Sequence, residues 1–379
     1  MANRKRPLGL GVIGCGWVAQ ERHLPALHGM GDAEVIAISD TNAECLNRVA
    51  ERFHIQNRCL DYRVMLDLPT IEAVAVCVPT QFHVEVALAV LDAGKHVFIE
   101  KPLALNLDDA ARLIERAAQS RHKAMVGFNM RWHRLVRQAR EIIQRGSLGG
   151  LDLMRTVFTA GSHFRPDLPP WRLQHELGGG LLFEHAVHHF DLWRFLLRSE
   201  VEEVLAKSWG EQSAAERTTV AAQMENGVLA ASVFSLRASA DNELEIYGQA
   251  GRLRVSCYRF DGLDFCRTSD SPGGIRTRLQ GVARALREVP QAVLRLRQGG
   301  DYVASYQAEW RHFIDAVRHD TPVECTLTDG RRALQVALAA VHSAASGQAV
   351  KVAQAPAKIT PLPSQPGSAS RSAHGSPLR

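Results

Sequence analysis

Short apolar runs rich in β-branched residues alternate with longer amphipathic segments over the first third of the chain. Such an alternation of strand and helix is typical of a parallel sheet that is covered by helices. The apolar runs predict strands at residues 8–13, 34–39, 73–78, 96–99 and 124–128. The amphipathic segments predict helices at residues 17–29, 42–53, 81–93 and 107–120. Asn106 is placed to cap the last of these helices.

The pattern changes after residue 128. A basic helix is predicted at residues 132–145, and runs of alternating character follow, such as 153–160 and 228–236. These runs predict a mixed α+β domain with a largely antiparallel sheet. Three further helices are predicted at residues 181–197, 302–318 and 329–346. We therefore predict domains at residues 1–128 and 129–353, followed by a disordered, Pro- and Ser-rich tail at residues 354–379.

The composition is that of a globular protein of two domains, with 379 residues, 46% hydrophobic and 22% charged. Lys and Arg outnumber Asp and Glu by 45 to 40, but residues 1–6 and 351–379 hold seven of the basic residues and no acidic one. The body of the chain lacks the excess of positive charge that nucleic-acid binding needs. No apolar run reaches the roughly 18 residues of a membrane span. From the charge balance and the lack of a long apolar run, we expect a protein that binds neither nucleic acid nor a membrane. The seven cysteines form no C-x-x-C pair, so we expect a reduced, cytoplasmic protein.

The segment Gly14-Cys15-Gly16-Trp17-Val18-Ala19 matches the dinucleotide-binding pattern G-x-G-x-x-A between the first strand and the first helix. Gly14 permits the tight turn, and Gly16 lets the backbone approach a pyrophosphate. The N-terminus of the helix then faces the phosphates. Asp40 ends the second strand, where a carboxylate accepts hydrogen bonds from an adenosine ribose.

The residues that follow Asp40 favour NAD(H) over NADP(H). Neither Thr41 nor Asn42 is an arginine that would neutralise a 2′-phosphate. FAD enzymes use the same glycine pattern, so the pattern by itself leaves FAD open. A glycine-rich turn that binds nothing is the other alternative.

Motifs further along the chain point to one family. Glu100-Lys101-Pro102 follows the fourth predicted strand, and the glycines 178–180 open a helix that carries Glu184, His188 and Asp191. With these motifs the chain resembles the Gfo/Idh/MocA oxidoreductases, whose members largely interconvert alcohols and ketones on sugars, cyclitols and nucleotide sugars with NAD(P). Other matching pieces are Val78-Pro79-Thr80 with His83, Gly127-Phe128-Asn129 with Arg131, Trp171-Arg172, and Thr328-Asp329-Gly330-Arg331. The resemblance extends over residues 8–352.

The resemblance implies an N-terminal Rossmann domain, a C-terminal domain on an open-faced sheet, and an active site between them. It also implies a homodimer or homotetramer that forms through the open face, and a small, sugar-like substrate. The cofactor contacts that it implies are Gly14, Gly16, Trp17, Val18, Asp40, Pro79, Thr80, His83, Glu100, Lys101 and Asn129. The substrate contacts that it implies are Arg131, Trp171, Arg172, Glu184 and His188, although Trp171 and Arg172 could equally be structural. A cis peptide before Pro102 is a further implication.

Removing hydride from a carbinol carbon requires a base for the hydroxyl proton and a positive group beside the developing alkoxide. The resemblance assigns the positive group to Lys101 and the acid/base to His188, whose imidazole titrates near neutral pH. Glu184 lies four residues earlier, where it could orient the imidazole. The commoner family pattern has Asp at that position. This difference motivates the alternative that the chain is a catalytically silent NAD-binding sensor or partner protein.

Two other motifs receive weaker interpretations. Glu184, His185, His188 and His189 spread over more than one helix face, so we expect no metal site. Residues 281–300 hold four arginines and one acidic residue. We interpret this segment as a solvated insertion that pairs with a neighbouring subunit or domain. The alternative is a membrane-surface contact or an anion pocket.

Overall fold

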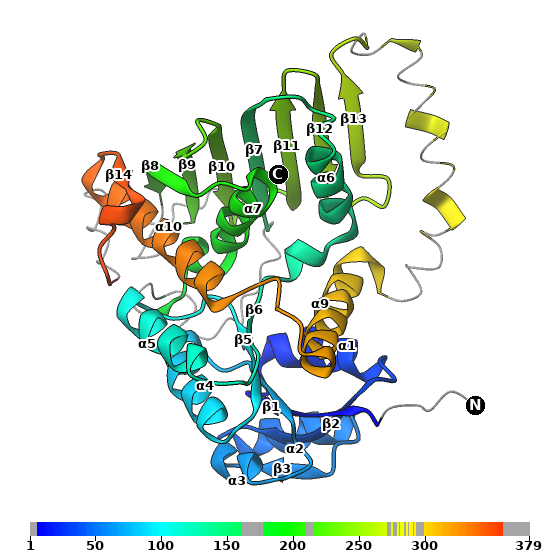
Figure 1. The fold of residues 1–379 in the computed structure, drawn as a ribbon, viewed down its shortest axis with the longest axis vertical. Coiled ribbons are helices and arrows are strands. Elements are labelled where there is room, and N and C mark those ends of the chain that lie inside the picture. Colours follow the sequence, from blue (N-terminus) through cyan, green and yellow to red (C-terminus); the bar gives the residue numbers. More distant parts are fainter. Residues whose placement is uncertain are drawn as a thin grey trace, which may run out of the picture.

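The computed structural model describes residues 6–160, 174, 177–209, 216–270 and 299–358, with scattered positions between 274 and 292. Two sheets dominate the described part, one built from the first third of the chain and one from its middle (Figure 1). Trp171, Arg172, the four arginines of segment 281–300 and the predicted tail beyond residue 358 lie outside the described residues. No helix within the described ranges is long and apolar enough to cross a membrane.

The first sheet has six parallel strands in the order β3-β2-β1-β4-β5-β6, which confirms the predicted Rossmann fold. Its strands are β1 (Leu8–Ile13), β2 (Ala33–Ser39), β3 (Asn57–Cys59), β4 (Ala73–Val76), β5 (His96–Glu100) and β6 (Ala124–Gly127). Strands β1 and β4 are buried at every position, as expected of central strands covered on both faces. The strand order reverses between β1 and β4, and ligands of such sheets bind at that point, beyond the carboxyl ends of the strands.

The helices of this part are α1 (Leu24–His28), α2 (Ala43–Arg52), α3 (Tyr62–Leu66), α4 (His83–Asp92) and α5 (Leu107–Ala118), with short turns η1 (Ala19–His23) and η2 (Thr80–Phe82). Asn106 caps α5 as predicted, since its side chain accepts from Asp109 N at 2.8 Å. The helix predicted at residues 17–29 is present from residue 17 to residue 28, but it is not a regular α-helix. A π-helical turn, η1, precedes α1, because Pro25 has no N–H with which to continue a regular hydrogen-bond ladder.

The second sheet has eight strands in the order β13-β12-β11-β7-β10-β9-β8-β14, and all its pairs except β7 with β10 are antiparallel. Its strands are β7 (Leu151–Thr159), β8 (Val201–Trp209), β9 (Arg217–Met224), β10 (Leu229–Ser235), β11 (Asp241–Gly248), β12 (Gly251–Ser256), β13 (Leu263–Arg267) and β14 (Val350–Lys351). Exposed and buried positions alternate strictly along β9. One face of the sheet is therefore packed and the other is open, as predicted.

The remaining helices and short turns come from the rest of the described chain: η3 (Asn129–Trp132), α6 (Arg134–Gln144), η6 (Leu182–Ala186), α7 (Val187–Leu197), α9 (Gly300–His319), α10 (Leu327–Ser346) and η7 (Val352–Gln354). Helix α9 returns to lie beside α1, and α10 contacts α5 and β6 as well as α7 and β8 (Figure 1). Helix α10 begins two residues before the predicted start, because Thr326 and Asp329 form a capping box. Residues 354–358, which the composition placed in the tail, lie against the start of α5, where Ala357 O accepts from Leu107 N at 2.9 Å.

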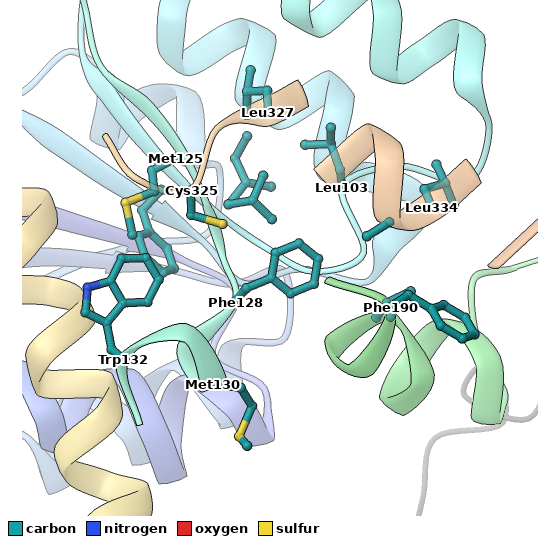
Figure 2. Packing of buried hydrophobic residues seen from close by; sticks show 14 of the residues in the cluster. Leu103, Met125, Phe128, Met130, Trp132, Phe190, Cys325, Leu327 and Leu334 are labelled. Carbon is teal, nitrogen blue, oxygen red and sulfur yellow. The ribbon is translucent and has the colours of Figure 1, made fainter. Parts of the chain in front are cut away.

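A shared core joins the two halves of the molecule. Phe128, Met130 and Trp132 of the segment after β6 belong to one buried cluster with Leu103, Cys325, Leu327, Leu334 and Phe190 of α7. Figure 2 shows the ring of Phe128 extending into the space between these elements. The E-K-P segment, η3, α7 and α10 are therefore held in fixed relation to one another. This packing sets the positions of the side chains described below.

Arg131 lies inside this core. Its guanidinium donates to both carboxylate oxygens of Asp191, at 2.6 and 2.5 Å, and to Glu324 O at 2.9 Å. Only 4% of Arg131 is exposed, and Asp329 lies 3.3 Å away. The structure thus gives this predicted substrate residue an interior ion pair that ties η3 to α7 and α10.

Candidate active site

A cavity of about 940 Å³ opens at the carboxyl ends of β1, β2, β4 and β5 and extends toward η6 and α7. Its volume is at the upper end of the range of small-molecule sites. It is lined by these predicted site residues: Gly14, Gly16, Trp17, Val18, Asp40, Pro79, Thr80, His83, Glu100, Lys101, Glu184 and His188. Asn129 and Arg131 are the described site predictions that do not line it. Asn129 is buried and donates to Ser305 Oγ at 2.9 Å.

The phosphate loop has the geometry that its glycines predict. Gly14 has φ +91°, and a Cβ there would lie 2.6 Å from Cys77 O, so only glycine fits. A Cβ on Gly16 would meet no atom within 4 Å. The backbone at Gly16 therefore borders open space in the cavity, which leaves room for a phosphate group to approach it.

Asp40 ties the loop to the end of β2. Its Oδ2 accepts from Cys15 N at 2.7 Å and its Oδ1 from Asn42 N at 2.8 Å. A carboxylate has about four acceptor sites, so these two bonds leave capacity for ribose hydroxyls. Together with the open space at Gly16, this arrangement fits the adenosine and pyrophosphate of a dinucleotide.

The structure also brings two arginines to the cavity that the motifs did not indicate. Arg63 of α3 lies 3.5 Å from Asp61 and 3.6 Å from Glu85. Arg22 of η1 lies between two rings, 4.7 Å from the centroid of Trp17 and 5.0 Å from that of Tyr302. Residues 54–72 contain no long apolar run, so α3 and β3 were not predicted and Arg63 could not be placed.

Lys101 directly follows β5 and is held at two points. Its Nζ donates to Glu184 O at 2.7 Å, and its backbone N donates to Glu100 Oε2 at 3.0 Å. The Lys101–Pro102 peptide is cis, as the resemblance implies. His83 lies behind this segment, with Nδ1 2.8 Å from Pro102 O and Nε2 2.9 Å from Val78 O.

Glu184 and His188 lie on either side of a change of helix type. Glu184 belongs to the π-helical turn η6, whereas His188 lies in the first turn of α7. The prediction that the two share one α-helical face assumed a regular helix, and a π turn shifts that register. Glu184 Oε2 lies 3.8 Å from Nε2 of His185. Such π turns often occur at functional sites.

His188 has the electrostatic environment of a neutral imidazole. Burial and then the positive charge of Lys101 lower the pKa of His188 well below its ordinary value of 6.5. Its ring packs edge-on against Phe128, with the centroids 5.7 Å apart. Its Nδ1 is buried and has no hydrogen-bond partner among the residues that the structure describes.

The cavity is also lined by aromatic and amide groups that the sequence analysis missed: Phe158, Asn242, Tyr258, Tyr302 and Tyr306. The side-chain oxygen of Asn242 is buried without a partner in the described ranges. Asn242 and Tyr258 come together through the pairing of β11 with the end of β12, where Cys257 N donates to Asn242 O at 2.8 Å. Only the spacing of Tyr302 and Tyr306, one helical turn apart, was a local signal.

No three His, Cys, Asp or Glu side chains of the described segments are grouped in a way that could hold a metal ion. All seven cysteines are free thiols. The chemistry available at the cavity is therefore that of a buried imidazole, an ammonium group and several carboxylates beside a dinucleotide loop.

Two family models match the chain. The model of the oxidoreductase family with an NAD-binding Rossmann fold matches residues 8–128, and the model of the GFO/IDH/MocA C-terminal domain matches residues 136–254. Together they span more than half of the chain. The chain belongs to the Gfo/Idh/MocA oxidoreductase family. It is therefore an oxidoreductase with an NAD-binding Rossmann fold.

Named relatives resemble this oxidoreductase over almost its whole length. Myo-inositol 2-dehydrogenase of Thermotoga maritima is 29% identical over 352 residues, which cover 90% of this chain and 98% of the relative. Levoglucosan dehydrogenase of Pseudarthrobacter phenanthrenivorans is 26% identical, with 92% and 98% covered. A solved structure of levoglucosan dehydrogenase in complex with NADH and levoglucosan has a TM-score of 0.79 at 23% identity, with 92% of this chain and 100% of that chain covered. This last similarity is one of fold.

The two glycines of the phosphate loop should respond differently to an added methyl group. Gly16→Ala should lower NADH affinity about tenfold and leave the free energy of unfolding within about 0.5 kcal/mol of wild type, because the methyl enters open space. Gly14→Ala should cost more than about 1 kcal/mol, because its φ is positive and Cys77 O is too close. Fluorescence titration and denaturant unfolding measure both quantities. Unchanged NADH affinity in Gly16→Ala would contradict the placement of the phosphates.

Proposed function

We propose that this oxidoreductase uses NAD(H) to interconvert a secondary alcohol and a ketone on a sugar, cyclitol or nucleotide sugar. The observation that carries the proposal is that Lys101 and His188 line the same cavity as the dinucleotide loop. Asp40 follows β2 and Lys101 follows β5, which are separated by three interstrand spacings, or about 14 Å. A dinucleotide with its adenosine at Asp40 would extend along the sheet toward Lys101.

The preference for NAD(H) over NADP(H) follows from the charges around the ribose site. The Asp40 carboxylate accepts from hydroxyl groups and repels a 2′-phosphate. Arg63 is the cation that reaches the cavity from α3, and Asp61 and Glu85 lie within 3.6 Å of it. The nicotinamide, when bound, supplies the acceptor or donor of hydride.

His188 and Lys101 have complementary roles in this proposal. His188, neutral at neutral pH, takes the hydroxyl proton during alcohol oxidation and returns it during ketone reduction. We place this proton at Nε2, because Nδ1 is buried. The Lys101 ammonium, held by Glu184 O, stabilises the developing alkoxide. Burial and, after it, the same charge lower the pKa of His188 and so keep the base unprotonated.

The part of the cavity that Phe158, Asn242 and Tyr258 line suits a substrate with several hydroxyl groups. Asn242 offers a buried side-chain oxygen, and Tyr258 a hydroxyl group, beside the ring of Phe158. Polar groups on an aromatic wall are what a polyol or sugar ring needs for orientation. The names of the relatives, an inositol and a levoglucosan dehydrogenase, agree with this class of substrate.

Replacing Lys101 separates catalysis from cofactor binding. Lys101→Met should lower kcat by a factor of about 10² to 10⁴ and leave NADH affinity within about threefold, because the adenosine end is unaffected. Turnover of myo-inositol, levoglucosan and a panel of related polyols is followed by NADH absorbance, with exposed Lys351→Met as the matched control. Tight NADH binding with no turnover of any polyol or sugar by the wild type would favour the silent-sensor alternative.

The pH profile tests the state of His188. The imidazole acts as a base only when unprotonated, so a lowered pKa extends oxidation activity to lower pH. We expect kcat/KM for alcohol oxidation to stay level as the pH falls through 6.5 and to decline only below that value. An acid limb centred at or above 6.5 would contradict the assignment of His188 as the base.

We further propose that the chain forms a homodimer or homotetramer through the open face of the second sheet. Leu205, Trp209, Leu229 and Val233 on this face are between 44% and 59% exposed. Exposed apolar side chains on adjacent strands are typical of an interface. Sedimentation velocity should show a dimer or tetramer for the wild type and a monomer for Leu205→Arg combined with Leu229→Arg. A monomeric wild type would contradict this proposal.

A further inference from the structure

Behind Lys101, three buried side chains from distant parts of the chain form a line of hydrogen bonds. Trp310 Nε1 of α9 donates to His23 Nδ1 at 3.1 Å. His23 Nε2, at the end of η1, lies 2.8 Å from Glu100 Oε1. Glu100 Oε2 in turn accepts from the backbone N of Lys101 at 3.0 Å. At most 5% of Trp310, His23 or Glu100 is exposed.

The donor at one end of this line determines the tautomer of His23. An indole N–H can only donate, so Nδ1 of His23 must carry a lone pair. A neutral imidazole has one N–H, which must then lie on Nε2 and point to the Glu100 carboxylate. The opposite tautomer would set a lone pair of Nε2 against the carboxylate oxygen at 2.8 Å, which is repulsive.

The rings around His23 leave it little freedom to rotate. Phe98 and Tyr306 meet its ring edge-on, each with a centroid distance of 5.4 Å, and Trp310 does so at 5.8 Å. Phe98 also stacks on Trp310 at 4.5 Å. Close packing of this kind holds side chains in single rotamers. The orientation of the Glu100 carboxylate is thus set by His23 and Trp310, neither of which lines the cavity.

His23 is also connected to the dinucleotide loop through the turn that follows the loop. It ends the η1 turn, which begins three residues after Gly16. In that turn Gln20 N donates to Gly16 O at 3.1 Å, and the Gln20 side chain donates to Cys15 O at 2.7 Å. The loop that fits the pyrophosphate and the segment that carries Lys101 are therefore joined through one imidazole.

We propose that His23 and Trp310 are positioning residues for Lys101. Trp310 fixes the tautomer of His23, His23 fixes the Glu100 carboxylate, and the carboxylate fixes the backbone at Lys101. Small displacements of a catalytic group reduce the rate far more than they reduce binding. This inference rests on the proposed function, because it assumes that Lys101 acts on the substrate.

Nitrogen NMR of the wild-type protein tests the tautomer without any variant or substrate. In the full chain labelled at histidine, His23 should show a bare Nδ1 and a protonated Nε2, with and without NADH. A His23→Gln spectrum assigns the signal. Protonation at Nδ1, alone or together with Nε2, would overturn the proposal.

Kinetics of four variants test the consequence for Lys101. Trp310→Phe keeps the packed ring and removes the donor, so kcat should fall about tenfold while the substrate KM and NADH affinity stay within about threefold. Trp193→Phe is the matched control, because the indole N–H of Trp193 is buried without a partner among the described residues. It should leave kcat within about twofold. His23→Leu should lower kcat about a hundredfold, and His23→Gln, whose amide N–H can reach Glu100, should recover most of that loss.

The outcomes separate this inference from the proposed function. Wild-type kcat in Trp310→Phe and His23→Leu, with Lys101→Met inactive, would overturn the positioning role and leave the function standing. Equal losses of kcat, NADH affinity and thermal stability would show a structural role only and would also overturn it. Full activity of Lys101→Met would instead refute the proposed function. If His23→Leu does not fold, comparison of kcat between Trp310→Phe and Trp193→Phe still tests the positioning role.

Discussion

The attachment of Lys101 at two points is the constraint around which the site is arranged. Its ammonium group is held by Glu184 O of η6 at 2.7 Å, across the boundary between the first sheet and the second part of the molecule. Its backbone is held by Glu100 at 3.0 Å. A lysine on the surface would lose this orientation to side-chain entropy. Here the charge is fixed at the carboxyl end of β5, at the edge of the sheet where the dinucleotide loop lies.

Several other features follow from that position. Gly178 must be glycine because a Cβ there would lie 2.7 Å from Leu105 and 2.9 Å from Thr80, so the glycine run brings η6 close to the E-K-P segment. The charge of Lys101 contributes to the lowered pKa of His188. The Arg131–Asp191 pair holds α7 against η3 and thereby keeps His188 at the cavity. Breaking a buried pair of this kind by removing one partner costs about 3 to 5 kcal/mol.

The sequence predicted what is encoded locally and missed what depends on long-range contacts. The strands of the first sheet, the phosphate loop and the E-K-P segment are short, contiguous patterns, and the structure places them together. The strand β3 and helix α3 escaped prediction because they are short and half exposed. No residue pattern distinguishes a π turn from an α-helix, so the sequence did not predict the π turn at Glu184. The contact between His23 and Trp310 joins residues 287 positions apart, and no periodicity in the sequence indicates it.

The most direct test of the account is a fluorescence titration of the purified protein with NADH and, separately, with NADPH. Asp40 at the end of β2, with Gly16 bordering the cavity, predicts that NADH binds about tenfold or more tightly than NADPH. Replacement of Asp40 by Ala should narrow the difference. If NADPH binds as tightly as NADH, the role given to Asp40 would be contradicted. If neither nucleotide binds, the assignment of the cavity and the roles given to Lys101 and His188 would be contradicted.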